Sequence, residues 1–166
     1  MPSDPEFLTG LPAIIDSGVE VLVLGSFPSP SSLAAQQYYA HRQNQFWRII
    51  AAITSKPLPD LDYASRVICL LRHGIGVWDV YRHCRRAGAL DSAIKTAVPN
   101  DFTTLKTDVP RLRRICFNGQ ESSKFERTFR EQGYATYILP STSPAYTLSF
   151  ELKLERWREA LQPHSE

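Results

Sequence analysis

The chain has 166 residues, the usual length of one domain, and can bury a core that needs no disulfide or metal. Its composition, 43% hydrophobic and 22% charged residues, excludes a largely disordered or collagen-like protein. A formal net charge of +2 is too small to indicate nucleic-acid binding by itself, although it allows a local basic face.

The sequence also lacks the features of a membrane or secreted protein. No apolar run approaches the roughly 18 residues of a membrane span. Residues 1–9 do not combine a basic segment with the apolar segment of a secretion signal. We therefore expect a single soluble domain, residues 1–166, that is cytoplasmic and not associated with a membrane.

Four short apolar segments predict strands that are buried on both faces. In chain order they are residues 21–24, 75–80, 115–117 and 134–139. Helical patterns alternate with them, and these are the stripe Phe46, Ile49, Ile50 and Ile53, the segments 63–73 and 120–132, and the stripe Phe150, Leu154, Trp157 and Leu161. Strands that alternate with helices pair in parallel through crossovers. The sequence therefore predicts an α/β fold, a three-layer α/β/α sandwich with a central, mostly parallel four-stranded sheet.

The cysteines and histidines form no recognisable metal-ligand set. The three cysteines lack CxxC spacing, and the histidines are scattered; these residues are Cys69, Cys84, Cys116, His41, His73, His83 and His164. Zinc and iron–sulfur sites normally take four clustered ligands. We expect no metal site, no disulfide and no cofactor.

Three loops are expected at one edge of the sheet, because ligands of open α/β sheets bind beyond the carboxyl ends of the strands. The loops are residues 25–32, 118–119 and 140–144, and they hold Ser, Thr, Asn, Gly and Pro rather than charged residues. Residues 25–32 match neither a P-loop nor GxGxxG, so nucleoside triphosphate and dinucleotide binding are disfavoured. Glycine and hydroxyl side chains still allow close approach to phosphate oxygens.

Residues 38–47 combine aromatic, amide and basic side chains in ten positions. A flipped nucleobase needs an aromatic face for stacking and polar groups along its edge. Taken alone, Tyr38, Phe46 and Trp47 are more typical of a core, and Asn44 also fits the N-cap of the following helix. A single histidine such as His41 is most often a surface or structural residue.

The motifs together resemble the uracil-DNA glycosylase superfamily, with the best match to its hypoxanthine-DNA (deoxyinosine) glycosylases, the sixth family. The resemblance rests on the order and spacing of segments 24–29, 38–47, 76–80, 90–92, 117–119 and 139–145. It covers nearly the whole chain, from about residue 21 to residue 161.

The resemblance implies a role for individual residues. Asn44 matches the catalytic asparagine that positions water, and Phe27 stands where relatives carry a polar hydrolytic residue. Tyr39 matches the aromatic residue that stacks on the flipped base, and Asn118 matches a side chain at the base edge. The full set implied to bind the base is Gly25, Phe27, Tyr39, His41 and Asn118, and the set implied to contact DNA is Ser26, Pro28, Ser29, Ser31, Ser141, Thr142, Ser143 and Pro144.

One position departs from the family pattern. Arg42 follows His41 where the family is expected to have proline. Proline would fix φ and restrain the preceding residue, so Arg42 loosens this segment or adds a phosphate contact. Arg42, Arg48, Lys153, Arg156 and Arg158 are the cations expected near the DNA phosphates.

The sequence thus predicts a monofunctional glycosylase that acts on DNA containing a deaminated base, most simply hypoxanthine, and hands abasic sites to downstream repair enzymes. Uracil, xanthine or a mismatched base as substrate is an alternative. So are a catalytically silent DNA-binding module on the same fold and a hydrolase of free nucleosides. The absence of a GxSxG elbow disfavours ordinary hydrolase chemistry. We expect a monomer that is associated with the nucleoid when on DNA.

Overall fold

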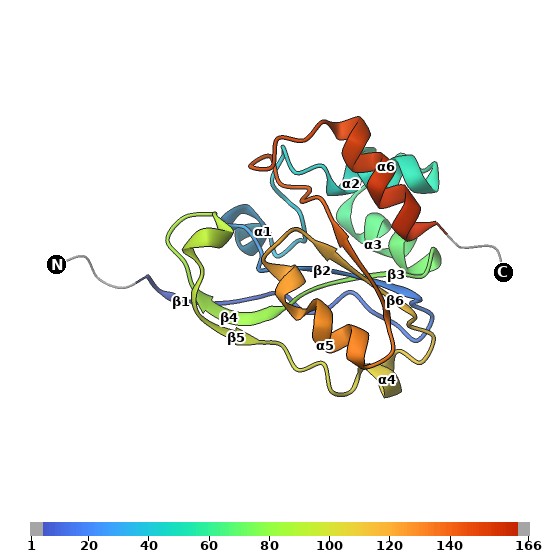
Figure 1. The fold of residues 1–166 in the computed structure, drawn as a ribbon. Coiled ribbons are helices and arrows are strands. Elements are labelled where there is room, and N and C mark those ends of the chain that lie inside the picture. The colour runs from blue at the N-terminus through green and yellow to red at the C-terminus, as the bar shows by residue number, and fades with distance from the viewer. Residues whose placement is uncertain (1–4, 163–166) are drawn as a thin grey trace.

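The computed structural model describes residues 5–162 and places a four-stranded parallel sheet at its centre (Figure 1). Its strands are β2 (Val21–Gly25), β3 (Ile75–Asp79), β6 (Arg114–Asn118) and β7 (Ala135–Leu139), in the order β3-β2-β6-β7. Gly25 lies opposite Asp79, and Asn118 lies opposite Leu139. The carboxyl ends of all four strands therefore meet at one edge, and the predicted sheet is confirmed.

Three longer helices cover one face of this sheet. They are α2 (Phe46–Thr54), α3 (Tyr63–Arg72) and α6 (Phe150–Leu161), with a short 3-10 turn η1 (Leu58–Asp60) between α2 and α3. Phe46, Ile49 and Ile50 of the predicted stripe are fully buried, together with Trp157 of α6. The apolar periodicity of the sequence thus identified the helix faces that pack on the sheet.

The opposite face is covered by short helices and by a second, small sheet. The helical elements are α4 (Leu105–Asp108), the 3-10 turn η3 (Ser122–Phe125) and α5 (Glu126–Glu131). Figure 1 shows α4 and α5 across the sheet from α2, α3 and α6, which confirms the three layers. The expected helix 120–132 is wrong in its first part, because α5 begins only at Glu126 after the 3-10 turn.

The second sheet was not predicted. Its strands β1 (Phe7–Thr9), β4 (Tyr81–Arg85) and β5 (Lys95–Pro99) pair antiparallel in the order β1-β4-β5. All five residues of β5 are exposed, and β1 has only three residues. Neither strand carries the buried apolar run by which a strand is recognised. The 3-10 turn η2 (Asp91–Ala93) lies in the connection between β4 and β5.

The segment that follows β2 is a loop only as far as Ser29. The helix α1 (Pro30–Ala35) follows, so the expectation of a loop through residue 32 is wrong. Ser29 caps this helix, because its Oγ accepts a hydrogen bond of 3.1 Å from the Ser32 amide, and Pro30 takes the first helical position. Among residues 5–162, no helix is both long and apolar enough to cross a membrane.

Candidate functional site

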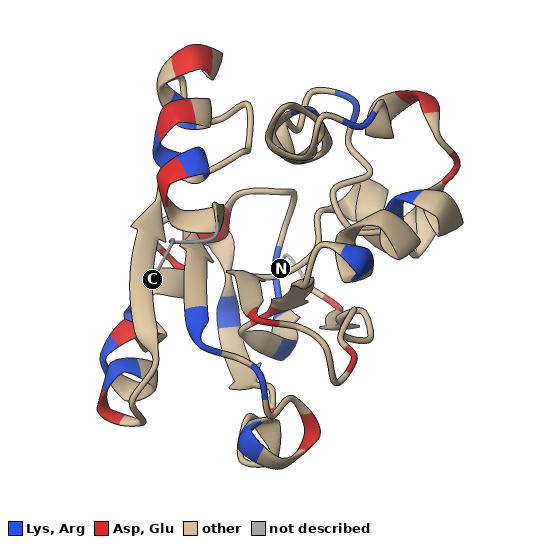
Figure 2. Cartoon of the chain, turned by 90° about the vertical axis from the view of Figure 1, so that its right-hand side faces the viewer, with Lys and Arg blue, Asp and Glu red and all other residues tan. Residues whose placement is uncertain are grey.

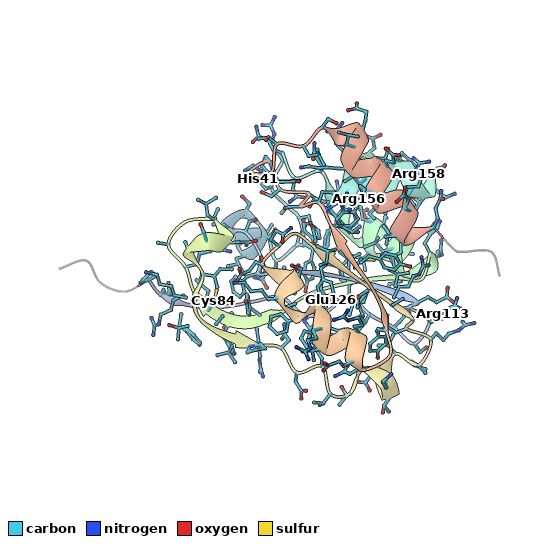
Figure 3. All side chains as sticks on the ribbon, viewed as in Figure 1. His41, Cys84, Arg113, Glu126, Arg156 and Arg158 are labelled. Atoms are coloured by element: carbon cyan, nitrogen blue, oxygen red, sulfur yellow. The ribbon has the colours of Figure 1, made fainter. Side chains whose placement is uncertain are left out.

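A cavity of about 340 Å³ opens at the carboxyl edge of the central sheet. Twelve of the residues predicted for the site line it, namely Gly25, Ser26, Phe27, Pro28, Ser29, Tyr39, His41, Asn44, Asn118, Ser141, Thr142 and Ser143. Figure 3 shows His41 beside the segment that leads into α6, which supplies the last three. Ser31 and Pro144 are exposed and do not line it. The loops expected to converge therefore do so.

Tyr39 enters the cavity because the preceding residue is fixed. The Tyr38 amide donates to the Tyr63 hydroxyl at 3.0 Å, and its carbonyl accepts from the Trp47 indole at 3.1 Å. The Tyr38 side chain is buried in the core, as the sequence allowed. Tyr39 then adopts φ 55°, a conformation that is costly for a bulky residue. Its ring stacks on Phe46, with 4.2 Å between the ring centroids.

Asn44 lines the cavity, but the expectation that it is the N-cap of the next helix is wrong, because Gln45 takes that position and Asn44 precedes it. The Asn44 Oδ1 accepts a hydrogen bond of 2.9 Å from the amide of Phe46, the first residue of α2. The side-chain amide is therefore held in one orientation. An amide oxygen has two lone pairs, so the same Oδ1 can accept a second hydrogen bond from the cavity side.

Asn118 joins the end of β6 to the loop 140–144. Its Nδ2 donates to Thr142 Oγ1 at 3.0 Å and to the Tyr39 hydroxyl at 3.2 Å. Its Oδ1 accepts from the Thr142 amide at 3.0 Å. Both donor hydrogens are thus used inside the protein, and only an acceptor position remains for a ligand. Thr142 is 1% exposed, so its side chain holds this loop instead of facing outward.

Arg86 packs against Phe27, which lies in the loop that follows β2. The Phe27 ring is 6% exposed and packs in the core, with the Arg86 guanidinium 5.4 Å from its centroid. Arg86 donates to the carbonyl oxygens of Pro28 at 2.8 Å and Gly88 at 2.9 Å. Nothing in the sequence assigned a role to this buried arginine, since its partners are backbone carbonyls and one of them, Pro28, lies 58 positions away.

Two acidic residues of the cavity were also missed. Asp79, the last residue of β3, is 4% exposed, and Asp91 accepts a hydrogen bond of 2.6 Å from Ser26 Oγ. Burial, with the nearby Asp91 charge second, raises the pKa of Asp79 to about 7. The signal in the sequence was an aspartate at the next-to-last position of the predicted strand 75–80. Ser26, expected to contact DNA, instead holds Asp91.

Lys153 braces the loop that precedes α6. Its Nζ donates to the carbonyl oxygens of Tyr146 at 2.7 Å and Ser143 at 3.3 Å, and the residue is 1% exposed. The expectation that Lys153 faces phosphates is therefore wrong. Arg48 is exposed, and its guanidinium lies 4.3 Å from the centroid of the Phe150 ring. Arg42 is exposed and follows His41, which lines the cavity.

Metal ligands do not gather within the described part of the chain, where no group of three His, Cys, Asp or Glu side chains is placed to hold an ion. Cys84 and Cys116 are buried free thiols. His164 lies outside the described residues. The polar groups of the cavity are amides, hydroxyls, the His41 imidazole and two carboxyls, which suit a neutral, hydrogen-bonding ligand better than a phosphate.

Comparisons with known proteins agree with this geometry. The model of the Uracil DNA glycosylase superfamily matches residues 12–162. A Methanosarcina acetivorans protein named hypoxanthine DNA glycosylase is 43% identical over 136 residues, 82% of this chain and 86% of the relative. The protein of that name from Methanosarcina barkeri is 39% identical over 92% of this chain and 97% of its own length.

A solved structure shares the fold as well. It is the solution NMR structure of a candidate uracil DNA glycosylase from Methanosarcina acetivorans, with a TM-score of 0.86 and 38% identity. The match covers 94% of this chain and 97% of that protein. The fold that the sequence predicted is therefore the fold of a related protein.

Proposed function

The chain belongs to the uracil DNA glycosylase superfamily, and from that premise we propose that it removes hypoxanthine from deoxyinosine in DNA. The observation that carries the proposal is the cavity itself. It is within the usual size of a small-ligand pocket, and Tyr39 and amide groups line it. A base inside a duplex cannot reach such a cavity, so it has to be rotated out of the stack.

Hydrolysis of the bond between sugar and base passes through an oxocarbenium-like state, in which the departing base takes up negative charge. In our proposal Asn44, fixed by the Phe46 amide, orients water toward the anomeric carbon with its remaining lone pair. Backbone amides of the loop around Phe27 stabilise charge on the base. An amide cannot remove a proton strongly, so turnover is expected to be slow.

The rim of the cavity supports binding of a nucleic acid. Two apolar side chains stand out from it on separate loops, Leu90 at 59% exposed and Tyr146 at 48% exposed. Ser29 and Ser143 line the same cavity, and the exposed Pro144 follows Ser143 in the chain. We propose that this rim replaces the stacking that the rotated base loses. Figure 2 shows Lys and Arg spread over the chain among Asp and Glu, so phosphate contacts are expected to be few.

A base-release assay tests the proposal. Labelled duplexes that carry inosine, uracil, xanthine or adenine at one position are incubated with excess enzyme and then cleaved with alkali at abasic sites. We expect the inosine duplex to be cleaved fastest and the adenine duplex not at all. Faster release of uracil or xanthine would change the assigned base. Binding without cleavage of any duplex would contradict the proposal and favour a silent DNA-binding module.

The remaining expectations belong to the same proposal. We propose that the protein acts as a monomer in the cytoplasm, on nucleoid DNA, and leaves abasic sites for downstream repair enzymes. Sedimentation of the protein alone tests the oligomeric state. The proposed reaction needs no cofactor, because each of its steps uses groups of the chain and water.

A further inference from the structure

One carboxyl oxygen of Asp79 is buried without a hydrogen-bond partner in the described part of the chain. Asp79 lies at the end of β3, where its backbone carbonyl accepts a hydrogen bond of 2.7 Å from Asn100 Nδ2. Its side-chain Oδ2 is buried and has no hydrogen-bond partner among residues 5–162. A buried carboxylate without donors is costly, whereas the neutral acid is not, so the site favours the protonated form.

The other oxygen of the group, Oδ1, lies against Gly25 at the wall of the cavity. A Cβ atom on Gly25 would lie 2.5 Å from Asp79 Oδ1 and 3.2 Å from the Tyr39 hydroxyl oxygen. Only glycine at position 25 lets the Asp79 carboxyl and the Tyr39 hydroxyl approach the end of β2 so closely. All three residues line the cavity, so Asp79 Oδ1 is the carboxyl oxygen placed at its wall.

The charged and titratable groups around Asp79 come from several elements. Asp91, the first residue of η2, disfavours the ionisation of Asp79. Arg86, which directly follows β4, opposes this effect in part. Arg86 donates hydrogen bonds to the carbonyl oxygens of Pro28 and Gly88. Tyr38 and Tyr39 lie on the segment before α2, their own ionisation disfavoured by burial and by Asp79, and His41 lines the mouth of the cavity.

On the basis of the proposed function, we infer that neutral Asp79 donates a hydrogen bond from Oδ1 to the carbonyl oxygen of the flipped base, O6 of hypoxanthine. The proton stays on Asp79 throughout. This hydrogen bond strengthens as negative charge develops on the departing base, so it stabilises the transition state more than the bound substrate.

The same arrangement selects deaminated bases. Deamination replaces an amino group by a carbonyl oxygen, which accepts the Asp79 hydrogen, whereas the amino group of adenine presents hydrogens to it. Asp79 could accept from the amino group of adenine only if its proton moved to Oδ2. That move is unfavourable, because it would bury a donor that has no acceptor. Asp79 thus serves as a specificity-determining residue that touches the base.

Single-turnover excision of hypoxanthine between pH 5.5 and 8.5 tests the inference. For the wild type we expect a rate that falls above about pH 7, approaching tenfold for each further pH unit. Asp79→Asn keeps a donor and cannot ionise, so its rate should stay within about tenfold of the wild type and lose the descending limb. Asp79→Ala should lose on the order of 10²-fold at pH 6.

Two control variants test whether the descending limb of the pH–rate profile comes from Asp79. His41→Gln and Asp91→Asn each remove another titratable group of the cavity, and the descending limb should persist in both, with a midpoint moved lower in Asp91→Asn. Thermal melting shows whether each variant is folded. Asp79→Asn replaces the carboxyl by an amide of nearly the same shape, so it tests the chemistry even where Asp79→Ala is unstable.

The outcomes separate the two proposals. A wild-type protein that releases no base from any duplex overturns the proposed function and this inference with it. A wild type that releases hypoxanthine with a rate that is flat or rises with pH overturns the inference alone. The inference is also overturned if folded Asp79→Asn is as inactive as Asp79→Ala, because an ionised Asp79 would then be acting as a base.

Discussion

Asn118 and Thr142 bind each other through two hydrogen bonds of 3.0 Å, one in each direction. The first residue ends β6, and the second lies in the loop after β7, 24 positions later in the chain. Thr142 also accepts, through its carbonyl, a hydrogen bond of 3.0 Å from the Gln45 amide. This pair therefore fixes one wall of the cavity to Gln45, the residue that follows Asn44.

Asn118→Ala should destabilise the fold as well as the site. It leaves the buried Thr142 amide without its acceptor, which costs about 1–3 kcal/mol. Chemical denaturation should show this loss, and thermal melting a fall of a few degrees. Thr142→Val is the matched control, since it removes only the hydroxyl and should cost less. Equal stability of Asn118→Ala and the wild type would contradict the role of the pair.

The sequence predicted the central sheet and its helices because their residues are apolar and regularly spaced. It did not predict β1, β4 and β5, whose exposed or charged residues are stabilised by pairing with distant strands. This is the usual case in which tertiary context overrides local preference. Such pairing cannot be recognised from a single segment.

The site residues that were predicted are those named by the family resemblance. The residues that were missed are those whose chemistry depends on being buried in the fold. Asn44 and Tyr39 do line the cavity, whereas the importance of Asp79 depends on Gly25, Asp91 and Arg86 being brought around it. The buried Lys153 was misjudged for the same reason. A lysine on a helix is usually solvated, and only the fold shows that its ammonium binds two loop carbonyls.

Asp79→Asn should raise stability above neutral pH. Because the pKa of Asp79 is about 7 when folded and near 4 when unfolded, the unfolded carboxyl loses its proton first as pH rises. Folding is therefore penalised progressively between about pH 4 and 7, by up to a few kcal/mol. The melting temperatures of variant and wild type should agree near pH 4 and diverge by pH 8. A constant difference across this range would contradict a neutral, buried Asp79.

Salt should weaken DNA binding, and Arg42 should account for part of the effect. If Arg42 contacts a phosphate, Arg42→Gln should reduce the slope of log Kd against log salt by about one. Lys153→Gln is the comparison, because this buried lysine binds loop carbonyls and should alter excision without changing the slope. Affinity measurements at several salt concentrations decide this. An affinity that does not vary with salt would argue against phosphate contacts.

Base release should persist in a chelator. Residues 5–162 contain no cluster of metal-ligating side chains, and each group assigned a part in the reaction is an amide, a hydroxyl or a carboxyl. We expect the single-turnover rate on an inosine duplex to be the same with and without EDTA. A rate that is lost in EDTA and restored by a divalent ion would show that an essential group has been overlooked.

Asn44→Ala should abolish base release far more than DNA binding. If Asn44 orients the water, its loss should slow single-turnover excision on the order of 10²-fold or more. The same substitution removes the acceptor of the Phe46 amide at the start of α2, which should cost about 1 kcal/mol of stability.

Gln43→Ala is the matched control for Asn44→Ala, because Gln43 is the exposed neighbour and does not line the cavity. It should excise at the wild-type rate and melt at the wild-type temperature. A folded Asn44→Ala protein that is about 1 kcal/mol less stable but excises hypoxanthine normally would leave Asn44 only the structural role of accepting from the Phe46 amide. Water activation would then have to be reassigned within the cavity, with His41 and the Ser141–Ser143 loop as the next groups to substitute.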